Sequence, residues 1–235
     1  MNTNHKYRIL VLSIFSIAMG LLEAAVVIYL RKLLYPGGFD FPLEPVNDYI
    51  ITLTEILREA ATIIMLVGVG YLYGHNFITR FAAFLYSFAM WDIFYYAFLK
   101  LILGWPESLF TWDVLFLIPV TWVGPVLAPI LVSITMIYYA FIFTKADHLF
   151  PNPKISKSEW LIIISSSFVI LISFIWDSSS YLIENNSFNE VFNFNSEKLL
   201  MLMHSYQPQY FNWWIFGLGE LGLLMGIIRF WRRVV

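Results

Sequence analysis

Long apolar runs dominate this chain, and polar residues lie mainly in the short stretches between them. A run of about 20 apolar residues is long enough to cross hydrocarbon as an α-helix. Applied along the chain, that length predicts six spans, at approximately 9–30, 50–74, 80–101, 111–143, 160–176 and 211–231. The pattern therefore predicts an all-α integral membrane protein, a six-transmembrane-helix bundle that forms a single transmembrane domain over residues 1–235.

Basic residues outside the spans lie mostly on one side of the predicted bundle. That side carries Lys6, Arg8, Arg80, Lys145, Lys154, Lys157, Arg229, Arg232 and Arg233. The loops of the opposite side carry Arg31, Lys32 and Lys198. Because segments rich in lysine and arginine stay in the cytoplasm, both termini are predicted to be cytoplasmic. This simple topology favours a multi-pass protein of the plasma membrane, most readily the bacterial inner membrane.

The fourth apolar segment, 111–143, is too long for one straight crossing. It contains Pro119, Pro125 and Pro129, and proline removes a helix hydrogen bond and clashes with the preceding turn. We expect the fourth helix to be long and proline-broken, with a short outer piece near 109–123 and a true span near 126–143. The alternative is a long, kinked and tilted helix.

Two extracytoplasmic loops are expected to be ordered. The first, 31–48, is rich in proline and glycine, which is typical of turns. The second, 177–210, contains an apolar stretch that Asn195 or Ser196 could cap as a short helix, with His204 at its end. Such a helix is expected on the membrane surface or in the mouth of the bundle.

Composition excludes several functional classes. The chain is 60% hydrophobic and 19% aromatic, its mean hydropathy is +0.72, and its net charge is −2. A negative charge gives no electrostatic basis for a nucleic-acid partner. The absence of cysteine excludes Fe–S clusters, and the four histidines lie mostly in predicted tails or loops, so haem is disfavoured.

Ionisable residues inside the predicted spans are the strongest indication of function. Burying a charge in a bilayer costs several kcal/mol, so such residues usually face the protein interior and often mark a working site. At nearly one depth lie Glu23, Glu59, Asp92 and Glu220, with Glu55 and Arg58 one turn further out. The polar groups are therefore predicted to gather in the outer half of the bundle, above a closed apolar inner half.

A short internal similarity relates the first two spans. Residues 22–28 resemble residues 58–64, and each stretch has a glutamate followed by two alanines. Small residues let membrane helices approach closely, so the first two helices are expected to pack on each other.

The acidic layer can support acid–base or metal chemistry. Two acids in different surroundings can act as general acid and general base, and an acid near aromatic rings can protonate an olefin or ether. Oxygen ligands would also suit a hard divalent cation, although no ligand set is assigned. The predicted catalytic residues are Glu23, Glu59 and Asp92. The predicted substrate-binding residues are Glu55, Arg58, Asp113, Glu220, Tyr95, Trp91 and His204.

The stretch Glu55-x-x-x-Glu59 resembles the acidic motif of membrane undecaprenyl-diphosphate phosphatases over five residues. The glycine-, serine- and arginine-rich motif that accompanies it in that family is absent from this chain. The resemblance therefore implies no residue roles here.

Three functional classes remain open. The first is a membrane enzyme that acts on a lipid-like or isoprenoid substrate. The second is a non-catalytic subunit of a larger membrane complex or homo-oligomer, in which protonated acids join helices and Arg58 neutralises Glu55 or Glu59. The third is a proton- or cation-coupled transporter, since intramembrane acids commonly relay protons. Membrane lipids are the expected partners in each.

Overall fold

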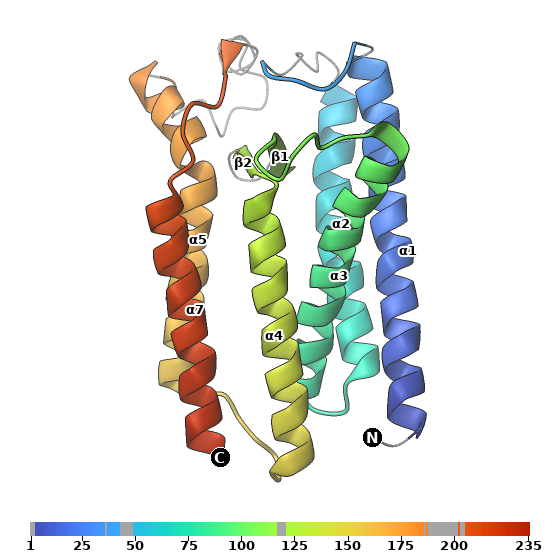
Figure 1. Ribbon diagram of the computed structural model, residues 1–235, viewed down its shortest axis with the longest axis vertical. Helices are drawn as coiled ribbons and strands as arrows, with labels where there is room; N and C mark the ends of the chain where they lie inside the picture. The colour runs from blue at the N-terminus through green and yellow to red at the C-terminus, as the bar shows by residue number, and fades with distance from the viewer. Residues whose placement is uncertain are drawn as a thin grey trace.

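The computed structural model describes residues 3–35, 37–42, 49–116, 121–185, 187, 202 and 205–235. Within these residues the chain forms six helices and one two-stranded antiparallel hairpin. The elements are α1 (Thr3–Leu34), α2 (Tyr49–Tyr73), α3 (Phe77–Leu103), β1 (Trp112–Phe116), β2 (Trp122–Pro125), α4 (Leu127–Leu149), α5 (Lys157–Glu184) and α7 (Trp213–Val234). The helices run up and down one bundle, and α1 begins at the end where α7 finishes (Figure 1).

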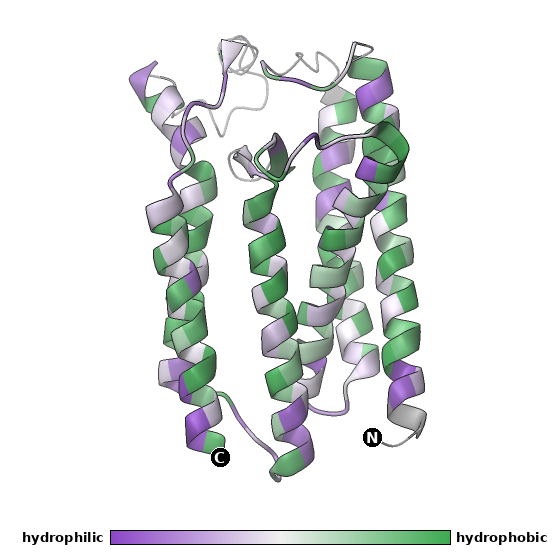
Figure 2. Ribbon diagram, in the orientation of Figure 1, coloured by the Kyte–Doolittle hydropathy of each residue, from purple (hydrophilic) through white to green (hydrophobic). Residues whose placement is uncertain are grey.

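Five of these helices, α1, α3, α4, α5 and α7, are long and apolar enough to cross a membrane. Apolar residues cover their middle parts, while hydrophilic residues gather toward the two ends of the bundle (Figure 2). The chain therefore has the character of a multi-pass membrane protein. Helix α2 has 25 residues but carries Glu55, Arg58 and Glu59 in its first half. A sixth span and the cytoplasmic position of the termini stay predictions.

The fourth apolar segment differs from its prediction. Its outer part forms the hairpin β1–β2, in which Asp113 pairs with Gly124 and Val114 with Val123. Helix α4 begins only at Leu127, has 23 residues, and holds Pro129 in its first turn, where proline is tolerated. A long fourth helix is therefore wrong, because the outer part of this segment pairs as strands. The bundle is helical apart from this hairpin.

The second loop that was predicted to be extracytoplasmic begins later than expected. Helix α5 continues to Glu184, so the first residues of 177–210 are helical. The predicted short helix near His204 lies outside the described residues.

Helix α3 is the centre around which one side of the bundle packs. Helices α1, α2 and α4 each lie along α3, while α5 lies along α7 and α4 joins the two groups through α7. The expected close packing of α1 on α2 is wrong. Gly20 of α1 instead faces α3, where a Cβ atom would lie 2.8 Å from the carbonyl oxygen of Trp91.

The end of the bundle that carries both termini, which we call the inner end, is packed with apolar side chains of α3, α4 and α7, including Ile78, Phe143, Ile227 and Phe230. At the inner end, Ser156 and Glu159 form a capping box that starts α5. Glu159 is fully buried and accepts hydrogen bonds from Arg233, with Nε 2.7 Å from Oε1, which joins the ends of α5 and α7. These contacts join the helices at the inner end of the bundle.

We predict that Gly20→Ala destabilises the protein, because the added methyl group meets backbone atoms of α3. Overpacking of this kind costs about 1–3 kcal/mol. Denaturation in detergent, followed by circular dichroism, measures the loss. Gly68→Ala in α2 is the matched control, since a Cβ there meets nothing within 4 Å. Equal stability of the two variants would contradict the close α1–α3 contact.

Candidate functional site

A cavity of about 770 Å³ lies inside the bundle, and we refer to it as the main cavity. Residues of α1 to α5, of the hairpin and Leu223 of α7 line it. Helix α2 packs mainly on α3 and α5 mainly on α7, and within the described residues α2 and α5 do not pack along each other. Direct packing of helices therefore does not close the cavity wall between α2 and α5, and we refer to this part of the wall as its open side.

Three ionisable residues form an ion triad in the wall made by α1 and α2. Arg58 donates to Glu55 Oε2 from Nε at 3.0 Å and from Nη2 at 2.6 Å, and Nη1 donates to Glu23 Oε1. Their side chains are only 13–22% exposed. The predicted pairing of Arg58 with an acid is thus confirmed for Glu55 and extends to Glu23. Helices α1 and α2 do not pack closely, and this triad links them in one half of the bundle, as the contact of Arg8 with Tyr73 does at the opposite end.

A second buried ion pair attaches the hairpin to α1 and α3. Arg31 Nη2 lies 3.0 Å from Asp113 Oδ1, and the Tyr96 hydroxyl donates to Asp113 Oδ2 at 3.1 Å. The Arg31 guanidinium carbon is 4.1 Å from the ring centroid of Phe39 and 3.7 Å from that of Trp105. Burial raises the pKa of Asp113 to about 6, and Arg31 opposes this shift. The guanidinium of Arg31, 3.0 Å away, favours the ionised form of Asp113.

Asp92 has a different environment from the paired acids. It lies on α3 and lines the main cavity together with Trp91 and Tyr95. Ser133 of α4, which is fully buried, donates to Asp92 Oδ2 at 2.8 Å. Asp92 is thus held by a neutral hydroxyl, whereas Glu23, Glu55 and Asp113 are held by guanidinium groups.

Glu220 does not belong to the main cavity. Thr135 of α4 donates to Glu220 Oε2 at 2.6 Å, while Glu220 Oε1 is buried with no hydrogen-bond partner within the described part of the chain. Thr135, the hydrogen-bond partner of Glu220, lines the main cavity together with Ser133, although Glu220 itself is not among the lining residues. The convergence of all four acids stays a prediction for Glu220.

The other predicted residues fall into two groups. Those that line the main cavity are Glu23, Glu55, Arg58, Glu59, Trp91, Asp92, Tyr95 and Asp113. His204 lies outside the described residues. Eight of the ten residues predicted from sequence are therefore brought into one cavity.

The charged residues in the cavity wall are mostly acidic. Five carboxylates and two guanidinium groups line it, which gives a formal charge of −3. Both guanidinium groups already have a carboxylate within hydrogen-bond distance. Among the described residues, no three acidic or histidine side chains are grouped so that they could hold a metal ion. A divalent cation stays a prediction without an assigned ligand set.

Two residues of this site, Arg31 and Ser133, were not predicted from sequence. Arg31 is near the outer end of the first apolar run, where arginine ordinarily extends to the membrane interface. Nothing in the sequence therefore indicated that Arg31 is buried. Ser133 is a common residue in membrane helices. Only the packing of α4 on α3 identifies it as the partner of Asp92.

Comparisons with protein-family models, with curated proteins and with solved structures find no match to this chain. Its function must therefore be argued from the geometry of the cavity.

We predict a strong coupling between Arg31 and Asp113. Removing one partner of a buried ion pair costs about 3–5 kcal/mol, because the other charge stays buried alone. Arg31→Met and Asp113→Leu should each destabilise the protein by that amount, and the double variant should lose clearly less than their sum. Denaturation in detergent measures all three. Glu107→Leu, at an exposed position, is the control, and additive losses would show that the pair is not coupled.

Proposed function

We propose that the protein is a membrane-embedded enzyme that acts on a lipid-like or isoprenoid substrate by carboxylate acid–base chemistry. The observation that carries this proposal is that one cavity combines an apolar, aromatic wall with ionisable side chains. Its apolar wall includes Phe84, Phe88, Trp122, Leu171 and Phe174. Its volume of about 770 Å³ is in the range of sites for substrate-sized molecules.

The open side between α2 and α5 supports entry of the substrate from the bilayer. A hydrocarbon chain that passes between these helices stays in an apolar environment and meets the apolar wall directly. A water-soluble substrate is not expected to use this route, because it would first have to leave water and enter the bilayer. The inner end is packed with apolar side chains such as Phe143, Ile227 and Phe230, which disfavours a transport path through the bundle.

Asp92 is the proposed general acid, because it faces the cavity and has a neutral hydrogen-bond partner. When Asp92 transfers its proton to a substrate alkene, a C–H bond forms and a carbocation remains on the neighbouring carbon. The faces of Trp91 and Tyr95 and the negative formal charge of the wall stabilise that cation. Loss of a proton to the carboxylate of Glu59 then gives a rearranged, neutral product, and proton transfer through solvent restores both acids.

We predict that Asp92→Asn abolishes turnover while the protein stays folded. The amide has the shape of the acid and can keep the contact with Ser133, but it has no acidic proton to give. Loss of one general acid typically lowers the rate by 10²–10⁴-fold. Comparison of membrane-lipid extracts by mass spectrometry, from cells that produce the wild type or the variant, should show a product only with the wild type.

Glu220→Gln is the matched control for Asp92→Asn, because Glu220 is also a half-buried acid held by one hydroxyl of α4 but is not among the residues that line the main cavity. It should leave the lipid change intact. A lipid profile that is identical for the wild type and for Asp92→Asn, with both proteins folded, would contradict an enzymatic role of Asp92.

We further predict that Met136→Trp displaces the bound lipid, because Met136 lines the main cavity. Native mass spectrometry of gently extracted protein should find a lipid adduct on the wild type and at least a tenfold lower occupancy on the variant. Ile134→Trp is the control, since Ile134 is two residues away on α4 and is 53% exposed. Equal occupancy of both variants would show that the lipid is annular and does not occupy the cavity.

A non-catalytic subunit is the second candidate, and the open side between α2 and α5 is the observation that favours it. A transmembrane helix of a partner, or of a second copy of this chain, could complete the cavity wall there. In that case a stable protein partner, and no lipid adduct, would accompany the wild type in the same native spectra.

A further inference from the structure

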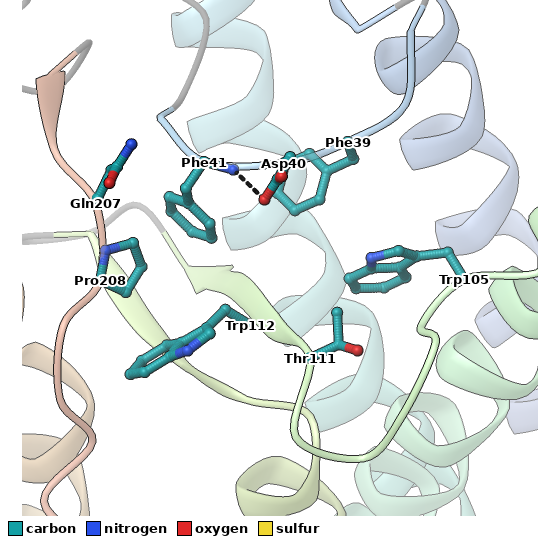
Figure 3. Close-up of a pocket in the computed structure, with 8 residues that line it drawn as sticks. All are labelled: Phe39, Asp40, Phe41, Trp105, Thr111, Trp112, Gln207 and Pro208. Carbon is teal, nitrogen blue, oxygen red and sulfur yellow. Dashed lines mark hydrogen bonds between the residues drawn. The ribbon is translucent and has the colours of Figure 1, made fainter.

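A second cavity lies at the outer end of the bundle, and we refer to it as the outer pocket. Its volume is about 350 Å³, and it is lined by Phe39, Asp40, Phe41, Trp105, Thr111, Trp112, Gln207 and Pro208. Figure 3 shows these side chains around an open centre, contributed by the segment after α1, the segment from α3 into β1, and the segment before α7. We propose that the outer pocket binds an ammonium group, as found in choline-like and other quaternary amines.

The walls of the outer pocket are held in place by hydrogen bonds. The Tyr206 hydroxyl donates to Asp177 Oδ2 at 2.7 Å, and the amide of Gln209 donates to the same oxygen at 3.2 Å, which fixes the segment before α7. On the opposite wall, the amide of Val126 donates to the carbonyl oxygen of Thr111 at 3.0 Å. The pocket is therefore part of the folded structure and is built from three separate segments.

Four of the eight lining side chains are aromatic, and among the described residues that line the pocket Asp40 alone is charged. Aromatic faces attract cations through the ring quadrupole, and quaternary ammonium groups are commonly held in this way. A nearby carboxylate adds a favourable charge. An anion would find no cationic side chain in this lining and would face Asp40.

The chain itself already places a cation against this aromatic group. Arg31 lies between the rings of Phe39 and Trp105, both of which line the outer pocket. Asp113 balances the charge of Arg31, so Arg31 adds no net positive charge beside the pocket. The rings of Phe41 and Trp112 belong to the same lining and are available to a cation from outside.

The ammonium group has two possible sources, a free quaternary amine and a lipid head group. Phe39 lines both the outer pocket and the main cavity, so the two cavities are neighbours. A lipid could place its ammonium group in the outer pocket and a chain in the main cavity. The ammonium site is independent of the acid–base chemistry proposed above, and its test uses no turnover.

The test compares choline with dimethylbutanol, the uncharged carbon isostere of choline. Titration of the purified full-length protein is followed by tryptophan fluorescence and by isothermal calorimetry. Choline should bind at least roughly tenfold more tightly than the isostere, because the two differ in the charge that the rings and Asp40 attract. Equal affinities, or no binding of choline at millimolar concentrations, would overturn the proposal.

Two variants locate the binding. Asp40→Asn should weaken choline several-fold and leave the isostere unchanged, and Trp112→Leu should weaken choline at least roughly tenfold. Glu107→Gln is the control, since Glu107 is an exposed acid near the same end of the bundle and lines neither cavity. An undiminished affinity in both Asp40→Asn and Trp112→Leu, with the proteins folded, would place the binding elsewhere and refute the site.

A short-chain phosphatidylcholine, used below its micelle concentration, distinguishes the two sources. Tighter binding than choline, reduced by Met136→Trp, would assign the ammonium to a lipid that also occupies the main cavity. Binding equal to choline, unaffected by Met136→Trp, would assign the site to a free amine. Weaker binding than dimethylbutanol would contradict an ammonium site.

Discussion

Hydrocarbon cannot solvate a charge, and the outer half of this bundle is arranged around that constraint. Arg58 lies between Glu23 and Glu55 and connects α1 with α2, which otherwise do not pack along each other. Arg31 pairs with Asp113 and so attaches the hairpin to α1. The charged groups thus join elements that apolar packing leaves apart. The main cavity exists in the space between those elements, and the positions of its walls depend on these two arginines.

The apolar runs predicted the helices well because helix length in a membrane is set by the thickness of hydrocarbon, which is the same for every sequence. The hairpin was not predictable in the same way. Trp112, Val114 and Phe116 are as apolar as residues of a span, and only pairing with β2 makes them a strand. Helix α4 begins only at Leu127 because strand β2 continues to Pro125, just before it.

The candidate site was partly predictable for a related reason. The depth of a residue in the membrane follows from its position along a span, so Glu23, Glu59 and Asp92 could be grouped from sequence alone. All three line the main cavity. The neighbour that a side chain meets around a helix depends on which helices pack beside it, and the sequence does not reveal that packing. Glu220 is held by Thr135 and does not itself line the cavity, and Ser133 becomes important only because α4 packs on α3. The pairing of Arg58 was anticipated, whereas the burial of Arg31 between two rings was not.

For a ligand that enters from the bilayer, as proposed above, the open side between α2 and α5 changes how affinity is expressed. Such a ligand is dissolved in the bilayer, and its effective concentration is its mole fraction among the lipids. Occupancy then depends on the composition of the surrounding leaflet more than on the aqueous phase. A weak site can stay full in one membrane and empty in another, so the lipid environment itself becomes a determinant of when the cavity is used.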